Sequence, residues 1–499
     1  MDSKNNNCIY LCVTSEPWIE VAKELRINYN IHPTYIIHWA KESLAFEKAF
    51  PDTHRCSIEK AWKGLCFSEA LNRTSLDEPT LNSIAKYELV GIKMMDRLDP
   101  TRESFSFSER QHFFRELVMQ WLAVIRNNDI RLVISPSIPH RVFDYALYVA
   151  AKMESIDFYM FQMVPFGSRT IMIEDIDSMG VLSSEETKDK SLKFEVDKKI
   201  NLIRGDYEEA IPSYMVRQEV ENSRNIKKNI TSVFRRIKSV KRFFGSSPNT
   251  YWVEKEKSPQ DSKYNWFNFY LLKIKQKRYL QKLKNQYESL TQKVDGNESY
   301  VLVALHYQPE ETSCPTGGVF MNQELIVKML VEALSNECCI YVKEHKSQFY
   351  SSMEGAVGRD LSFYQKLLKI SPRVKLVSAN DNPFHLIDNA LCVCTISGTI
   401  GWESALRGTP ALHFGRAWYE GMPLTYKVKS LADLTMALQA IENEKNADND
   451  ILSSQYNFHY RLATRFIHAK HYKANLKNSD IQIKDSVINL VDEFSKRLS

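Results

Sequence analysis

The chain has 499 residues, of which 43% are hydrophobic and 25% are charged, as is ordinary for soluble globular proteins. This length exceeds what one hydrophobic core supports, so two domains of about 200 to 250 residues each are expected. No apolar run approaches the roughly 20 residues of a membrane-spanning helix, which argues against an integral membrane protein. The net charge of +5 is modest and comes with no nucleic-acid-binding module, so nucleic acid is not an expected partner.

The first residues are polar and lead directly into an apolar stretch at Ile9–Val13, without the basic and apolar regions of a signal peptide. A cytoplasmic protein is therefore expected. The nine cysteines are an odd number, and this favours reduced, buried thiols over a disulfide framework. Four of them fall in predicted strands: Cys338, Cys339, Cys392 and Cys394.

Apolar runs alternate with helical patterns over residues 1–182, which predicts a Rossmann-like α/β domain. This domain is expected to carry the acceptor-binding and catalytic groups. The predicted strands are Ile9–Val13, Thr34–His38, Leu132–Ser135 and Phe158–Met163, and the long helices between them are Phe105–Asn127 and Val142–Met153.

The alternation stops in residues 183–298, which become charged and helical and are predicted to form an interdomain segment. Between Arg224 and Tyr251 there are eight basic residues and no acidic one, and apolar residues recur at helical spacing. This predicts a basic amphipathic helix over Arg224–Phe244, followed by a second basic stretch at Leu271–Leu283. Two interpretations stay open: a peripheral contact with anionic lipid or glycan at the inner face of the cytoplasmic membrane, or a solvated interdomain helix.

A second α/β series over residues 299–450 predicts another Rossmann-like domain, and residues 451–499 are expected to form helices that pack back on the first domain, with Ser454–Tyr472 helical. Two Rossmann-like domains facing a cleft, joined by a basic helical segment, make the GT-B architecture the expected fold class. The predicted strands of the second domain are Tyr300–Tyr307, Cys338–Val342, Val374–Val377, Leu391–Ile396 and Ala411–Phe414.

The segment Leu391–Gly415 reads as strand, turn, helix and strand in immediate succession. The turn is Ser397-Gly398-Thr399, and a helix that begins near Thr399 would point its free N–H groups and its positive dipole end beyond the strand, as in many phosphate sites. Glu403 lies one helical turn further on, where it could reach a ribose hydroxyl. The alternative is an ordinary strand-turn-helix without a ligand.

Three loops that follow strands of the second domain are unusually polar. The first runs from His306 to Glu311 and contains Gln308 and Glu310, the second is Lys343-Glu-His-Lys346, and the third is the Ser-Gly-Thr turn. Ligands of open parallel sheets lie beyond the carboxyl ends of the strands, so these loops predict one site.

Three motifs carry a resemblance to a known family: Leu305-His-Tyr-Gln-Pro-Glu310, Tyr341-Val-Lys-Glu-His345, and Ser397-Gly-Thr-Ile-Gly-Trp-Glu403 followed by Gly408-Thr-Pro410. They resemble the signature of bacterial capsule and surface-polysaccharide biosynthesis glycosyltransferases, a group that includes transferases of Kdo and related ulosonic acids. In the first domain the resemblance is looser and rests on Pro139-His140 and Asp144. The chain has Lys346 where the family commonly has proline.

The resemblance implies a GT-B enzyme that transfers an acidic sugar of the Kdo or nonulosonic acid type from a CMP-activated donor to a glycan or lipid-linked glycan acceptor. It implies no cofactor other than this donor, and no metal. Gln308 and Glu310 would bind the donor sugar and Glu403 the ribose. The residues expected to bind the nucleotide are Lys343, His345, Lys346, Ser397, Gly398, Thr399 and Glu403.

Candidates for catalysis lie in the first domain. Asp175-Ile-Asp177 has the spacing of a metal-binding pair but lies far in sequence from the phosphate loops, so catalysis is the preferred interpretation. In a retaining double displacement, Asp175 or Asp177 would act as nucleophile or base, with His140 as proton-transfer partner and Arg169 as a clamp for the sugar carboxylate. The alternative for each is an ordinary loop carboxylate or capping histidine.

Two other functions stay open on sequence grounds. One keeps the fold and changes the donor, giving a CDP-polyol phosphotransferase or a UDP-sugar glycosyltransferase. The other is a non-catalytic capsule assembly factor that docks at the membrane through the basic helices. Protection of the folded protein by a particular nucleotide would separate these alternatives.

Overall fold

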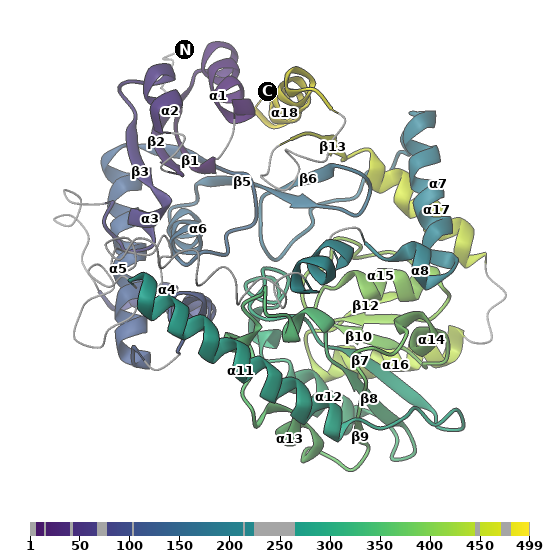
Figure 1. The fold of residues 1–499 in the computed structure, drawn as a ribbon. Coiled ribbons are helices and arrows are strands. Elements are labelled where there is room, and N and C mark those ends of the chain that lie inside the picture. Colours follow the sequence, from purple (N-terminus) through teal and green to yellow (C-terminus); the bar gives the residue numbers. More distant parts are fainter. Residues whose placement is uncertain are drawn as a thin grey trace.

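The computed structural model describes residues 6–13, 16–39, 43–66, 77–101, 104–212, 215–223, 265–444, 450–470 and 481–498. Within these ranges the chain forms two β-sheets, one of seven strands and one of six, each flanked by helices (Figure 1). The predicted basic helix over Arg224–Phe244 lies outside the described residues.

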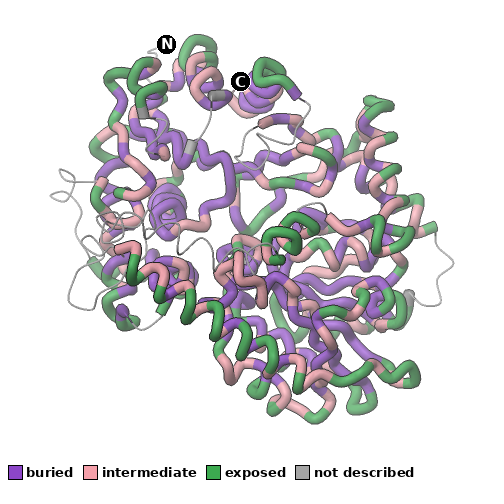
Figure 2. The backbone as a smooth tube through the Cα atoms, in the orientation of Figure 1, coloured by how far each residue is buried: buried purple, intermediate pink, exposed green. Residues whose placement is uncertain are grey.

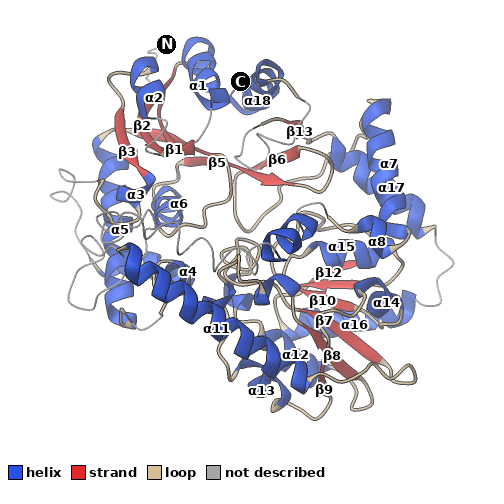
Figure 3. Cartoon of the chain, viewed as in Figure 1, coloured by secondary structure: helices blue, strands red, loops and turns tan. Residues whose placement is uncertain are grey.

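The N-terminal sheet has the strand order β13-β6-β5-β4-β1-β2-β3 (Figure 3). Strands β1 to β5 are parallel, whereas β6 is antiparallel to β5 and β13 is antiparallel to β6. From β3 to β5 the order is 3-2-1-4-5, as in Rossmann folds. The strands are β1 (Asn6–Val13), β2 (Ile31–His38), β3 (His54–Ser57), β4 (Ile130–Ser135), β5 (Asp157–Met163), β6 (Arg169–Ile173) and β13 (Ile467–His468).

The C-terminal sheet has the order β12-β11-β10-β7-β8-β9, and all of its strands are parallel. Numbered from β7, this is again the Rossmann order 3-2-1-4-5-6, so the predicted GT-B fold class of two Rossmann-like α/β domains is confirmed. The strands are β7 (Tyr300–Ala304), β8 (Cys339–Lys343), β9 (Val374–Val377), β10 (Val393–Thr395), β11 (Ala411–His413) and β12 (Thr425–Lys427).

Side-chain caps mark where several helices begin. In α5, Ser106 accepts the Glu109 N–H while the Glu109 carboxylate accepts the Ser106 N–H, which is a capping box. The helices are α1 (Glu16–Tyr29), α2 (Ser43–Ala49), α3 (Ile58–Ala61), α4 (Glu78–Met94), α5 (Phe107–Asn127), α6 (Phe143–Met153), α7 (Lys190–Arg204), α8 (Tyr207–Ala210), α11 (Trp266–Leu290), α12 (Glu324–Ala333), α13 (Phe363–Leu368), α14 (Pro383–Asp388), α15 (Thr399–Leu406), α16 (Leu431–Glu444), α17 (Ile451–Ala463) and α18 (Ile483–Leu498).

The two sheets share buried apolar contacts. Their central strands are largely buried, as expected for parallel sheets covered by helices (Figure 2). The largest apolar cluster joins residues of the first sheet, such as Ile9, to Leu302 of β7 and Trp402 of α15. Since one contiguous cluster runs through both units, packing fixes the second domain against the first.

The end of the chain returns to the N-terminal sheet, where α18 packs on α1 and β13 extends the edge beyond β6 (Figure 1). The prediction of one helix over Ser454–Tyr472 is wrong from Thr464 to Lys470, and the last two residues of that range lie outside the described residues. The helix α17 ends at Ala463, and Ile467 and His468 pair with Thr170 and Arg169 instead. The backbone of these two residues is satisfied by the sheet edge rather than by a helical turn.

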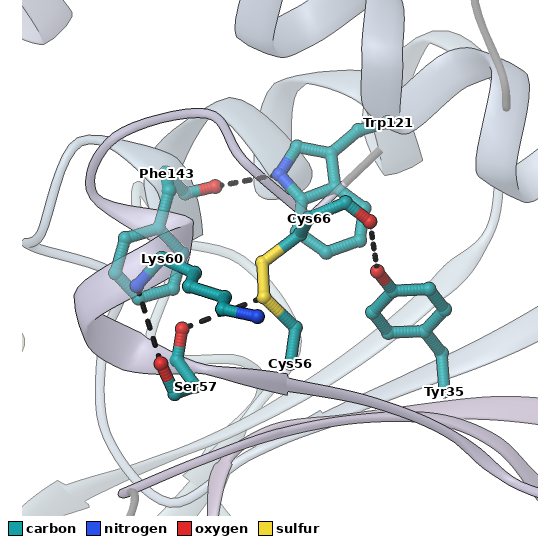
Figure 4. Close-up of a disulfide and its surroundings, with 7 residues drawn as sticks. All are labelled: Tyr35, Cys56, Ser57, Lys60, Cys66, Trp121 and Phe143. Atoms are coloured by element: carbon teal, nitrogen blue, oxygen red, sulfur yellow. Dashed lines mark hydrogen bonds between the residues drawn. A yellow bond between two sulfur atoms is a disulfide. The ribbon is translucent and has the colours of Figure 1, made fainter. Parts of the chain in front are cut away.

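The prediction that all cysteines are reduced is wrong for one pair. A disulfide joins Cys56, which lies in β3, to Cys66 (Figure 4). The intervening α3 and its turn bring the two Cα atoms to 5.7 Å, which is a normal separation for a disulfide. The Tyr35 hydroxyl donates to the Cys66 carbonyl at 2.7 Å and fixes this loop on β2. The other seven cysteines are free and buried, as expected.

Candidate functional site

Each sheet reverses its strand order at one place, and ligands of open α/β sheets bind beyond the carboxyl ends of the strands at such a reversal. In the C-terminal sheet the reversal lies between β7 and β10, which are neighbours although they are far apart in the chain. In the N-terminal sheet it lies between β1 and β4. The loops after β7 and β10 carry the polar motifs of the sequence, and the loop after β4 carries His140.

His306, just after β7, connects the two C-terminal loops. Its Nε2 accepts the Ser397 N–H at 3.2 Å and lies 2.9 Å from Thr395 Oγ1, while its Nδ1 lies 3.2 Å from Thr312 Oγ1. With Nε2 accepting, the neutral ring carries its proton on Nδ1. Burial lowers the pKa of His306 to about 3, so the ring stays neutral and holds both loops in register.

The Ser-Gly-Thr turn follows β10 and leads into α15, as the sequence predicts. The Ser397 hydroxyl donates to the Thr312 carbonyl at 2.7 Å, and the Gly398 N–H donates to Thr395 Oγ1 at 3.3 Å. Two glycines are required by close approach. A Cβ at Gly398 would lie 2.9 Å from Thr395 Oγ1, and one at Gly401 would lie 2.3 Å from the Tyr419 hydroxyl. The helix N-terminus at Thr399 is therefore held tightly against β10 and the residues after β11.

The predicted basic residues lie at the end of β8 and just after it. Besides burial, which is the larger effect, His345 lowers the pKa of His306 and is therefore close to it. Lys343 is buried and donates to the Ala379 carbonyl at 2.7 Å, and burial lowers its pKa to about 8. His345 accepts the Ser347 N–H on Nδ1 at 3.2 Å, and burial lowers its pKa to about 4. Lys346 is half-buried. Both Lys343 and His345 thus already have partners within the chain.

Gln308 and Glu310, the two residues predicted to bind the donor sugar, differ in how far their side chains are already bound within the protein. The Gln308 side chain is buried, accepts from Arg359 Nη1 at 2.9 Å and donates to the Met321 carbonyl at 2.7 Å, so both ends of its amide are used. The Glu310 residue is exposed. Arg359 also binds the buried Glu344 carboxylate at 2.8 Å, which makes Gln308 part of a buried polar network.

Glu403 lies on α15 and faces α7, which packs against that helix. Burial raises the pKa of Glu403 to about 7, although Lys199 of α7, Thr399 and Arg407 lower it. Lys199 is itself buried, and this burial lowers its pKa. The carboxylate lies one turn from the Ser-Gly-Thr turn, as the sequence predicts.

In the first domain, His140 is the predicted residue that reaches the other domain. Its Nδ1 lies 2.6 Å from the Ile138 carbonyl and 3.2 Å from Glu311 Oε2, across the domain junction. Burial, together with Arg141 and Arg97, lowers the pKa of His140, so its ring is neutral. The two strand-order reversals therefore meet at the contact between His140 and Glu311.

Within the described part of the chain, the other predicted residues of the first domain form no hydrogen bond or ion pair with the second domain: Asp175 is bound within its own domain, and Arg169 binds α7. Asp175 accepts from Lys152 at 2.6 Å and from the Tyr148 hydroxyl at 2.8 Å, and the Asp177 N–H donates to it at 2.8 Å. Burial raises the pKa of Asp175, but these three partners lower it by more, so the carboxylate is ionised. Asp177 is exposed. Arg169 binds Glu195 at 2.7 Å.

Two residues at the junction are absent from the predicted site. Glu311 touches His140, and Arg416, two residues beyond Phe414, extends toward the first domain and donates to Gln162 Oε1 at 2.5 Å. Arg416 is 2% exposed, and among the described residues its Nε and Nη2 have no hydrogen-bond partner. Burial lowers the pKa of Arg416 to about 10, while the negative charges of Glu311, Glu420, Asp177 and Asp175 raise it. Arg416 is thereby linked electrostatically to both predicted aspartates.

No group of three or more His, Cys, Asp or Glu residues that could hold a metal ion occurs in the described part of the chain. Within that part, no helix is both long enough and apolar enough to cross a bilayer.

Residues 258–472 match the model of a family described as capsule polysaccharide biosynthesis protein. This part of the chain resembles that family. The three motifs of the second domain that suggested the resemblance lie within the matched residues, so the predicted resemblance is confirmed there, whereas Pro139-His140 and Asp144 lie outside them. No curated protein matches the chain.

Several solved structures are similar to the chain. A β-Kdo 2,4 transferase, KpsC of Thermosulfurimonas dismutans, is 13% identical over 72% of this chain and 87% of that one, with a TM-score of 0.32. Its β-Kdo 2,7 transferase counterpart is 12% identical over 75% and 89%, with a TM-score of 0.29. The UDP-GlcNAc 2-epimerase of Methanocaldococcus jannaschii is 13% identical over 91% and 97%, with a TM-score of 0.24. These values are too low for the role of any residue to be transferred.

Proposed function

We propose that this protein is a GT-B glycosyltransferase of capsule or surface polysaccharide biosynthesis that moves an acidic ulosonic sugar, of the Kdo or nonulosonic acid type, from a CMP-activated donor to a glycan or lipid-linked glycan. The observation that carries the proposal is the network around His306, which joins the Ser-Gly-Thr turn to the loop after β7 at the strand-order reversal. That network lies within the residues that match the capsule biosynthesis family.

The nucleotide phosphate would lie at the N-terminus of α15, beyond Ser397 and Thr399, where helix N–H groups and the helix dipole stabilise negative charge. Lys343, His345 and Lys346 would add donors or positive charge from the neighbouring strand. The ribose would face Glu403. The chemistry would need no metal, because the leaving phosphate is stabilised by the helix end and these side chains.

The sugar would then extend toward the domain junction, where Arg416 interacts electrostatically with Asp175 and Asp177 and where His140 contacts Glu311. Asp177 is the more accessible of the two aspartates and is the preferred nucleophile of a double displacement. The Asp175 carboxylate, which is held by Lys152 and Tyr148, would position Asp177. Arg169, which is bound to Glu195, is proposed as a clamp for the sugar carboxylate only if that ion pair opens.

A nucleotide panel tests the donor class. The melting temperature is measured with CMP, CDP, UDP and AMP, since a ligand that binds only the folded state raises it. We expect CMP to give the largest shift, and the Ser397→Ala variant to give a smaller one. A shift with UDP and none with CMP or CDP would refute the ulosonic acid donor and favour a UDP-sugar transferase, and no shift with any nucleotide would favour an assembly factor.

Transfer itself is tested with a panel of CMP-ulosonic acids. Release of CMP in the presence of a glycan acceptor is measured, and the anomeric configuration of the new linkage is determined by NMR. Retained configuration supports the double displacement and inverted configuration refutes it.

The segment Arg224–Phe244, for which the sequence predicts a basic helix, is proposed to contact anionic lipid at the inner membrane face. The test is flotation with liposomes that contain phosphatidylglycerol. We expect binding to be lost when Arg235, Arg236, Lys241 and Arg242 are neutralised together, and binding that is unchanged in this variant would refute the contact.

A further inference from the structure

Glu311 lies where four separate segments meet. It belongs to the loop after β7, it touches His140 of the loop after β4, and it faces Arg416, which follows β11. The fourth segment is the short helix Met95–Arg97, whose Arg97 donates to the His140 carbonyl at 2.9 Å. Both domains therefore contribute side chains around one carboxylate.

The Glu311 carboxylate is accessible to a reactant. Its side chain is 30% exposed, whereas the His140 side chain is 13% exposed. His140 holds the carboxylate from one side. His140 Nδ1 lies 2.6 Å from the Ile138 carbonyl oxygen, so this nitrogen carries the ring proton and donates it to that oxygen, and the same nitrogen lies 3.2 Å from Glu311 Oε2. Glu311 is thus oriented by the first domain and still open to water.

Arg416 supplies a second observation at the same place. Its buried guanidinium leaves Nε and Nη2 without a hydrogen-bond partner among the described residues, and no carboxylate described there lies within ion-pair distance of it. An unpaired buried charge is costly, so an anionic group brought to this junction would be stabilised there. A sugar carboxylate or a donor phosphate has the required charge.

Opposing influences on the Glu311 carboxyl keep its pKa near neutral pH, which suits a group that accepts and releases a proton. Burial raises the pKa of Glu311 to about 7, although three guanidinium groups lower it, and an exposed neighbouring carboxylate raises it. A donor anion that binds to those guanidinium groups would screen them and raise the pKa of Glu311 further. The groups that face Glu311 are Arg141, Arg416, Arg97, Glu310 and His140.

We propose that Glu311 is the general base of the transfer, that His140 positions it, and that the charge of the bound donor strengthens it. This inference rests on the proposed transferase function. In the step, the acceptor O–H bond breaks and its proton goes to a Glu311 carboxylate oxygen. The acceptor oxygen forms a bond to the anomeric carbon, and the bond from that carbon to its leaving oxygen breaks with the electron pair on that oxygen. The proton then passes to water.

The leaving oxygen belongs to the CMP phosphate in a direct displacement and to Asp177 in the second half of a double displacement. In both reactions Glu311 accepts the proton of the acceptor hydroxyl. The alternatives in the first domain fit less well, because Asp175 is held ionised by Lys152 and Tyr148 and so is a weak base.

The test compares wild-type protein with Glu311→Gln and with Glu332→Gln, an exposed glutamate of α12 that serves as the matched control. CMP binding is measured by calorimetry, and transfer from the active CMP-ulosonic acid is followed between pH 5.5 and 9. We expect Glu311→Gln to bind CMP within about twofold of wild type and to lose at least about a hundredfold in kcat, a usual size for a lost general base. Glu332→Gln should match wild type.

The pH profile separates a base from a merely structural glutamate. In wild type, kcat/KM should rise through about pH 7, where the free enzyme's Glu311 loses its proton, and kcat should rise at a higher pH, because the bound donor raises the pKa. Glu311→Gln should lack both limbs. Glu311→Asp, which keeps the carboxylate but shortens the side chain, should keep the limbs at a kcat lowered about tenfold or more.

The outcomes are distinct. If wild type transfers and Glu311→Gln transfers equally well with the same pH limbs, the role of Glu311 is refuted while the proposed function stands. If wild type neither binds CMP nor transfers any CMP-sugar, the proposed function fails and this role fails with it. If Glu311→Gln does not fold, Glu311→Asp decides, and an unchanged kcat in that variant refutes the proposal.

Discussion

The two strand-order reversals occupy equivalent places in the two sheets, but their side chains are held differently. At the C-terminal reversal, the polar side chains of three loops bind one another, as His306 binds Thr395 and Thr312 and Gln308 binds Arg359. At the N-terminal reversal, His140 alone among the predicted residues contacts the other domain through its side chain, whereas Asp175 binds Lys152 of its own domain and Arg169 binds Glu195 of α7. In the proposed function, the cross-linked loops would form a preorganised ligand site, and the first domain would supply individual groups to it.

The largest effect on this difference between the two reversals is expected from replacing Arg359, whose side chain binds residues of the C-terminal loops. Its guanidinium binds Glu344 at 2.8 Å, Gln308 at 2.9 Å and the His306 carbonyl at 2.9 Å, and the Arg359 and Glu344 side chains are both buried. Arg359→Met leaves the Glu344 charge uncompensated and should cost about 3 to 5 kcal/mol of stability. Thermal and urea unfolding measure this, and CMP binding should weaken as well.

The matched control for Arg359→Met is Arg126→Met. Arg126 binds Glu154 at 2.7 Å, but the two side chains are 45% and 25% exposed. An exposed pair of this kind contributes about 0 to 1 kcal/mol. Equal losses in the two variants would contradict the difference between the buried network and a surface pair.

In the first domain, Asp177→Asn should leave CMP binding intact and lower transfer by at least about a hundredfold, as expected for loss of a nucleophile. Asp175→Asn is the comparison, since that side chain also binds Lys152 and Tyr148 and its loss should lower stability by about 1 kcal/mol. Binding is followed by calorimetry and transfer by CMP release. Full transfer in both variants would remove the aspartates from the mechanism and leave the first domain with His140 as its contribution.

A smaller effect is expected from crowding the first turn of α15. Gly401→Ala places a Cβ 2.3 Å from the Tyr419 hydroxyl, so the helix or the ring must move, at a cost of about 1 to 3 kcal/mol. The helix N-terminus would shift with it, and CMP binding should weaken. Tyr419→Phe removes the clashing oxygen and also the hydrogen bond to the Gly398 carbonyl, so the double variant should regain part of the lost stability. A double variant no more stable than Gly401→Ala would show that the contact is not the cause.

Much of the fold could be predicted from the sequence, because buried parallel strands appear as short apolar runs. Val374–Val377 was predicted with the observed bounds, and β7 stops at Ala304, short of the predicted Tyr307, where the polar loop begins. The strand β13 has two residues and no apolar run, since it depends on pairing with the edge of β6. The disulfide between Cys56 and Cys66 likewise depends on the path of the intervening turn.

The site was predicted less completely, and the reason is side-chain direction. The loops after β7, β8 and β10 do converge, but the sequence cannot tell that both ends of the Gln308 amide are used inside the fold. Of the adjacent pair Glu310 and Glu311, it is Glu311 that reaches His140. Arg416 could have been noticed as a lone arginine directly after the Phe414-Gly415 motif.

The smallest predicted effect is the pH dependence set by Glu403, a residue held in the C-terminal site without an ion pair at contact distance. An unfolded glutamate has a pKa of about 4.3, whereas burial raises that of Glu403 to about 7. Between these values the folded state binds more protons than the unfolded state, so this group's contribution to stability falls as the pH rises from 5 to 8. Glu403→Gln, which stays neutral, should gain stability relative to wild type over the same range, by about 2 °C in melting temperature. Glu332→Gln should show no such change. If pairing with Lys199 outweighs burial, the variant will instead lose stability at pH 8. That result would identify the carboxylate as half of an ion pair between α15 and α7 and would count against its proposed role in binding the ribose.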